Sequence, residues 1–150
     1  MKTYFSAFFA IAGLISIILF TNSCAKPDHS ADLPKEQQVV GSWWINRIQL
    51  RIYSASGVFL KDTIIKQTPK PKNYVEFEAN GGFKYQFNTT SPDQGTYQFV
   101  GSDSVVSNSI PQNYRWKMLT LTNVLFTVVS TGTDPAYPGT IVERYQTFVR

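Results

Sequence analysis

The sequence predicts an all-β domain, an antiparallel up-and-down meander of about eight or nine strands that closes into a barrel. Two observations favour this fold class. From Val39 onward no window keeps an apolar period of 3.6 residues, whereas short alternating runs recur with turn residues between them. The prolines of this part fall between or before the runs, with Pro111 at the end of one, because strand ladders need their N–H donors.

The first 23 residues have the composition of a signal peptide. Lys2 supplies a positive charge, and the stretch from Tyr4 to Phe20 is apolar apart from two serines. Because about 20 apolar residues usually cross a bilayer, an uncleaved membrane anchor is the alternative at this length. Either way, the sequence predicts an exported protein.

The single cysteine, Cys24, lies just after this apolar stretch. Here the segment resembles the signal peptide of bacterial lipoproteins, in which a cysteine in this place is acylated and becomes the mature N-terminus. Ser23 is the small residue that cleavage requires, whereas Thr21 stands where the family usually has an aliphatic residue. The resemblance implies that Cys24 is the lipid attachment site and that a bacterial membrane, expected to be the outer membrane, holds the protein. The alternative is a chance cysteine in a linker.

Residues 24–38 are expected to form a flexible tether, and residues 39–150 a single domain. "AKPDHSADLPKEQQ" is polar and contains two prolines, which is typical of disordered linkers. The only histidine, His29, falls in this tether. With one cysteine in the chain no intramolecular disulfide can form, so packing alone must stabilise the domain. A net charge of +4 is mild and gives no nucleic-acid signature.

Nine runs behind the tether are expected to be strands. They span residues 41–53, 58–66, 73–79, 83–88, 95–100, 104–110, 115–121, 124–130 and 139–149. Without a helix to cover it, the meander must close on itself or stack as two sheets. The short connections favour the barrel over the sandwich, which remains the alternative.

The clearest hairpin is "YVEFEANGGFKYQF", residues 74–87. A two-residue turn at Asn80-Gly81 would mix polar and apolar side chains on each face. A three-residue loop from Asn80 to Gly82 instead pairs Phe77 with Tyr85 and leaves one face apolar. The same register pairs Ala79 with Phe83, Val75 with Phe87, Glu78 with Lys84 and Glu76 with Gln86. We therefore expect one apolar face that is buried and one polar face that is exposed to solvent.

At "VVGSWWINRIQL" the chain resembles lipocalins, whose first strand opens with a G-x-W motif, here Gly41 and Trp43. Later runs, "GTYQFV", "RWKMLTLTNVLFTV" and "ERYQTFVR", follow the order of small lipocalin-like domains of bacterial lipoproteins. The resemblance covers about residues 39–150 and implies a barrel whose tryptophan closes one end under an arginine of the last strand. Antiparallel closure puts Arg150 nearest Trp43, with Arg144 farther along the strand.

Aromatic and apolar side chains on the expected inner face are candidates to line a ligand pocket. The alternative is that they only fill a small barrel. The candidates are Val75, Phe77, Phe83, Tyr85, Phe87, Tyr97, Phe99 and Trp116.

The domain lacks the residues that common catalytic and metal sites need. It has no histidine, no cysteine and no nucleophile motif, so we expect no enzyme activity, no metal and no cofactor. Two hypotheses for function stay open. In the first, the barrel of a membrane-anchored lipoprotein binds a small hydrophobic ligand. In the second, the barrel is filled, and its loops at 66–73, 88–94 and 131–139 bind a protein or glycan of the cell envelope.

Overall fold

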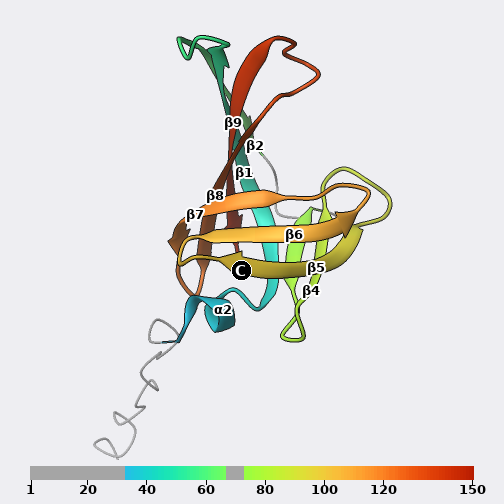
Figure 1. Ribbon diagram of the computed structural model, residues 1–150. Coiled ribbons are helices and arrows are strands. Elements are labelled where there is room, and N and C mark those ends of the chain that lie inside the picture. Colours follow the sequence, from blue (N-terminus) through green and yellow to red (C-terminus); the bar gives the residue numbers. More distant parts are fainter. Residues whose placement is uncertain (1–32, 67–72) are drawn as a thin grey trace, which may run out of the picture.

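The computed structural model describes residues 33–66 and 73–150, and within them the chain is an all-β barrel, as the sequence predicts (Figure 1). Eight antiparallel strands form the closed barrel, in up-and-down order, and one further strand lies outside it. The strands are β1 (Gly41–Ser54), β2 (Phe59–Lys66), β3 (Tyr74–Phe77), β4 (Gly82–Gln86), β5 (Asp93–Val100), β6 (Ser104–Ile110), β7 (Arg115–Leu121), β8 (Leu125–Gly132) and β9 (Thr140–Val149).

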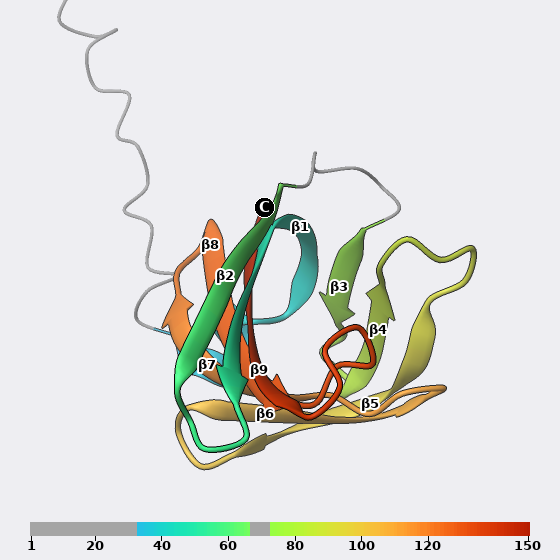
Figure 2. The same cartoon turned by 90° about the horizontal axis from the view of Figure 1, so that it is seen from above.

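The long strand β1 closes the barrel. Its first residues, Gly41 to Trp44, pair with β3, and its other edge pairs with β9 from Trp44 to Ser54. Viewed from above, β3 to β8 surround a common centre, and β1 and β9 complete the ring (Figure 2). The last strand runs antiparallel to the first, as closure of an even number of strands requires.

Strand β2 is the extra strand. It pairs only with the later part of β1, on the edge where β3 pairs with the earlier part. With β1 and β9 it forms an arm that projects beyond the ring (Figure 1). Phe59, Leu60 and Ile64 of this arm are exposed. The run expected at 58–66 is a strand, but the sequence does not show that this strand leaves the barrel.

The β3–β4 hairpin has the expected faces in a different register. Its loop has three residues, Ala79 to Gly81, because Glu78 and Gly82 are bonded across it (Glu78 N to Gly82 O, 2.8 Å). Gly81 takes the left-handed conformation, at φ 87°. The expected loop began one residue later, so the pairs are shifted by two: Val75 pairs with Tyr85, Phe77 with Phe83 and Glu76 with Lys84. An even shift leaves every side chain on its predicted face.

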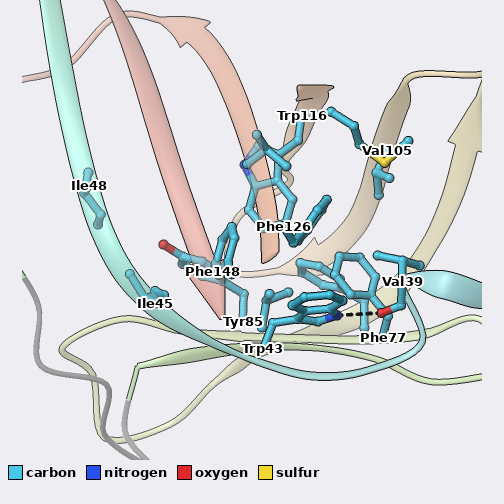
Figure 3. Close-up of a cluster of buried hydrophobic side chains, with 14 of the residues drawn as sticks. Val39, Trp43, Ile45, Ile48, Phe77, Tyr85, Val105, Trp116, Phe126 and Phe148 are labelled. Carbon is cyan, nitrogen blue, oxygen red and sulfur yellow. Dashed lines mark hydrogen bonds between the residues drawn. The ribbon is translucent and has the colours of Figure 1, made fainter. Parts of the chain in front are cut away.

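The core fills the half of the barrel where β1 begins. Trp43, Phe77, Phe126 and Phe148 are fully buried there, and their rings meet at centroid distances of 5.4 to 5.8 Å (Figure 3). The indole N–H of Trp43 donates to the Val39 carbonyl at 2.7 Å. A single cluster of aromatic and aliphatic side chains therefore occupies this half.

This half ends in a polar cap, and we call it the closed end. The guanidinium of Arg150 lies over the Trp43 ring, 3.9 Å from its centroid, and donates to the carbonyls of Gln38 and Val40. Gly41 makes room for it, because a Cβ there would lie 3.2 Å from Arg150 Nη2. The helical turn α2 (Lys35–Gln38), within the stretch expected to be a tether, lies beside this cap, with Lys35 Nζ donating to Ser102 O at 2.9 Å.

Replacing Arg150 by alanine is expected to lower the free energy of unfolding by about 1–2 kcal/mol, through the lost cation–π contact and hydrogen bonds. Arg150→Lys should be destabilised almost as much, because an ammonium lacks the planar guanidinium that both stacks on the ring and donates to the carbonyls. Urea unfolding of the three proteins measures the difference. Lys117→Ala, at an exposed lysine, is the control and should stay within about 0.5 kcal/mol. An Arg150→Ala variant as stable as this control would contradict the assignment.

The expected signal peptide, Cys24 and residues 24–32 of the expected tether lie outside the described residues, as do residues 67–72 of the first loop. In residues 33–66 and 73–150 no helix is long and apolar enough to span a membrane.

Candidate functional site: a cavity at the open end of the barrel

A cavity of about 660 Å³ opens at the end of the barrel opposite the Arg150 cap. We call this end the open end and this space the mouth cavity. Its walls come from the ends of β4 and β8, the starts of β5, β7 and β9, and the loops between them. The lining residues are Tyr85, Phe87, Thr89, Asp93, Pro111, Gln112, Asn113, Tyr114, Arg115, Trp116, Ser130, Thr131, Gly132, Thr133, Asp134, Pro135, Val142, Arg144 and Gln146.

The wall between the mouth cavity and the core is aromatic. Tyr85, Tyr114 and Trp116 form a triangle of rings, with centroid distances of 4.6, 5.3 and 5.7 Å. Trp116 also packs on Phe148 of the core at 5.9 Å. Tyr85 and Trp116 are only 6 % and 1 % exposed, so the half-buried Tyr114 is the ring of this triangle that faces the cavity, and the other two hold it rigidly from behind.

Buried polar groups stand among these rings. Gln146, only 1 % exposed, donates its amide N–H to the Tyr85 hydroxyl at 2.8 Å. The Tyr114 hydroxyl donates to the Asp93 carboxylate. Burial raises the pKa of Tyr85 to about 12, and burial together with the hydrogen bond to Asp93 raises the pKa of Tyr114 well above its ordinary value. Both phenols therefore remain protonated at neutral pH.

Two arginines and two aspartates make up the charged lining. Arg144 Nη2 donates to Asp134 Oδ2 at 2.9 Å, and the Asp134 side chain is 17 % exposed. Asp134 also accepts the backbone N–H of Ala136 at 2.9 Å through its other oxygen, which fixes the β8–β9 loop beside the cavity. Arg115 and Asp93 supply the second pair of opposite charges. The charges of the mouth cavity thus sum to zero.

The structure brings three of the expected ligand-binding residues to the mouth cavity, namely Tyr85, Phe87 and Trp116. The other five contribute to the packed barrel: Val75, Phe77 and Phe83 are buried core residues, and Tyr97 and Phe99 pack against that core. Strand parity identifies which side chains face inward, but not how far along the axis the core ends. For that reason the eight residues could not be divided from the sequence.

The two arginines of the expected barrel closure lie at opposite ends of the barrel. Arg150 lies over Trp43 at the closed end, whereas Arg144 lines the mouth cavity. The sequence analysis missed Asp93, Tyr114 and Gln146. A usable signal existed in β9, where Val142, Arg144, Gln146 and Phe148 share the inward parity and two of the four are polar. Polar residues at inward positions indicate a wet interior.

Raising the pH above 10 is expected to destabilise the fold through Tyr85. The unfolded phenol ionises near pH 10, but the folded one only near 12, so the stabilisation is complete below pH 10 and is lost as pH rises to 12. The loss should be about 2–3 kcal/mol. Urea unfolding at about pH 8, 10 and 11 should give a shallower decline for Tyr85→Phe than for the unchanged chain. Equal slopes would refute this assignment.

Within the described part of the chain, no group of three or more histidine, cysteine or acidic side chains is placed to hold a metal ion. The carboxylates of Glu76 and Glu78 lie outside the barrel and bind Lys84, at 3.1 and 2.6 Å. The hydrogen bond from Lys84 lowers the pKa of Glu78, and the hydrogen bonds to both glutamates raise the pKa of Lys84. These two glutamates therefore belong to a surface ion pair.

Comparison with known proteins gives no assignment. No family model matches the chain, and no curated protein matches it. The geometry of the mouth cavity is therefore the basis for the function proposed next.

Proposed function

We propose that the protein is an exported, lipid-anchored binding protein that holds a small molecule in the mouth cavity without turning it over. One observation carries this proposal: a cavity of about 660 Å³ with a rigid aromatic wall and convergent polar groups. Ligand pockets generally measure about 300–1,000 Å³ and combine apolar walls with a few placed polar groups. The closed end is filled by the core, so a ligand has one end at which to enter.

The anchor rests on the sequence of the N-terminal segment. An apolar run followed by Ser23 and Cys24 resembles a lipoprotein signal, and two acyl chains suffice to hold a protein on a bilayer. The chain enters the barrel at the closed end, through α2. The described chain therefore begins at the end opposite the mouth cavity, so an anchor that precedes it need not block the cavity.

Replacing Cys24 by serine is expected to move the protein from the membrane fraction to the soluble fraction, or to leave it uncleaved. Metabolic labelling with a radioactive fatty acid should mark the unchanged chain and not the variant. Ser23→Ala, which keeps a small residue before the cysteine, is the matched control and should remain labelled. A labelled Cys24→Ser protein would show that the anchor is elsewhere.

The binding function is tested on protein purified from its native host. Mass spectrometry of the denatured preparation should release one compound in near-stoichiometric amount. Gly132→Trp places a large ring at an open, inward position of β8, and should abolish that release. Val129→Trp, on the outward parity of the same strand, is the matched control. The proposal would fail if both variants released the compound equally, or if the unchanged protein released none. The loops at 88–94 and 131–139 would then become the sites to test for a partner.

A further inference from the structure

Resting on the proposed function, the polar groups of the mouth cavity specify the class of its ligand. We infer that the cavity binds a neutral, hydroxyl-bearing ring compound of the saccharide type rather than an acyl chain. The inference departs from the hydrophobic ligand that the aromatic content of the sequence suggests. It depends on three features of the cavity, namely its charge balance, its unused hydrogen-bonding capacity and its aromatic wall.

The charge balance favours a neutral ligand. Arg144 is already paired with Asp134 at 2.9 Å, and Arg115 is matched in number by Asp93. An anionic ligand would have to compete with Asp134 for Arg144 and would lie near the Asp93 carboxylate. A cationic ligand would meet the two arginines. Because like charges at short range cost free energy, either sign of net charge is disfavoured.

Hydrogen-bonding groups of both kinds remain available at the cavity. The Tyr85 hydroxyl accepts from Gln146, yet within the described residues it donates to no acceptor. The Gln146 carbonyl oxygen and the second oxygen of Asp93 accept no hydrogen bond from those residues either. Arg144 uses one of its nitrogens for Asp134. A ligand hydroxyl both donates and accepts, so several hydroxyl groups on one ring can satisfy this mixed set.

The aromatic wall suits the flat apolar side of such a ring. The half-buried Tyr114 presents its ring at the cavity, where it packs on the buried rings of Tyr85 and Trp116 at 4.6 and 5.3 Å, and Phe148 backs Trp116. Aromatic faces carry negative charge and attract the slightly positive C–H groups of a saccharide ring. The cavity thus combines an apolar surface with polar groups around it.

An acyl chain fits the same space poorly. It would cover the Tyr85 hydroxyl, the Gln146 amide and the Asp93 carboxylate without offering them a partner. Leaving buried donors and acceptors unsatisfied costs free energy for each group. The polar lining therefore selects against the ligand that the barrel fold alone would suggest.

The test uses the full chain in phospholipid nanodiscs, labelled with 5-fluorotryptophan. The chain has three tryptophans, of which only Trp116 lines the mouth cavity, so its fluorine resonance reports binding there while Trp43 serves as an internal reference. The probes are the neutral sugars D-glucose, N-acetyl-D-glucosamine and lactose, and the apolar probes are dodecanoate and 1-dodecanol. We expect a sugar to shift the Trp116 resonance saturably. Asp93→Asn should weaken that binding about ten- to a hundredfold. Asp103→Asn, the same change at the other end of the barrel, should leave it unaltered.

The outcomes separate this inference from the proposed function. If the apolar probes shift Trp116 and the sugars do not, the ligand class is wrong while the proposed binding function stands. If neither set shifts Trp116 and the native preparation also releases no compound, both are overturned. Sugar binding that is unaffected by Asp93→Asn overturns the assigned polar contacts and with them the inference.

Discussion

Replacing Trp43 by alanine is expected to lower the free energy of unfolding by about 3–5 kcal/mol. The side chain is fully buried and packs on Phe126 at 5.5 Å. Its N–H satisfies the Val39 carbonyl, and its ring supports the Arg150 guanidinium from below. The change therefore leaves a large void and removes the surface on which the polar cap rests. Urea unfolding followed by circular dichroism measures the loss.

Trp43→Phe keeps the test informative if Trp43→Ala does not fold. Phenylalanine fills most of the site and still supports the guanidinium, but it lacks the N–H donor, so the expected loss is about 1–2 kcal/mol. Because Trp43 lies at the closed end, ligand binding at the mouth cavity should be unchanged in this variant. If the free energy of unfolding of the Trp43→Ala protein stayed within about 1 kcal/mol of that of the unchanged chain, this account would be contradicted.

Replacing Gly95 by alanine is expected to cost about 3 kcal/mol. Gly95 lies in β5 opposite Ser109 of β6, and the two backbones approach so closely that a Cβ would come within 1.9 Å of the Asn108 carbonyl oxygen. Backbone atoms of a paired strand cannot rotate away as a side chain does. The β5–β6 ladder must therefore open or bend, and Asp93 at the start of β5 should move with it.

Gly132→Ala is the matched control, since it adds the same methyl group to a strand glycine that has nothing within 4 Å of the new Cβ. Its stability should change by no more than about 0.5 kcal/mol. Thermal unfolding of the two variants side by side measures the contrast. If Gly95→Ala proved as stable as Gly132→Ala, the close approach of β5 and β6 would be refuted.

The strands themselves could be predicted well from the sequence. The expected runs at 104–110 and 115–121 match β6 and β7, and 41–53 falls one residue short of β1. Alternation of apolar and polar residues is a local property of a strand with one buried face, so it can be recognised without knowing the partner strands. The antiparallel closure between first and last strands also follows from an even number of barrel strands.

The prediction was wrong in detail where two local solutions preserve the same faces. In the β3–β4 hairpin, a loop over Ala79 to Gly81 and one over Asn80 to Gly82 both keep Phe77 and Phe83 inside. The left-handed Gly81 and the bond between Glu78 and Gly82 decide between them. Likewise, β2 was expected to be a barrel strand, but β3 occupies the place beside the start of β1, so β2 pairs with the later part of β1 instead.

By itself the sequence determined the fold class, the strand positions, the two faces of the β3–β4 hairpin and the resemblance of the N-terminal segment to a lipoprotein signal. These features depend on periodicity and composition, which are local properties of the sequence. Only the tertiary structure decided which inward-facing residues pack as core and which line a cavity. Tyr85 and Phe83 share a parity and a strand, yet one lines the mouth cavity and the other does not. The difference lies in the position along the barrel axis at which side chains from opposite strands meet, and this is set by strand length, register and tilt together.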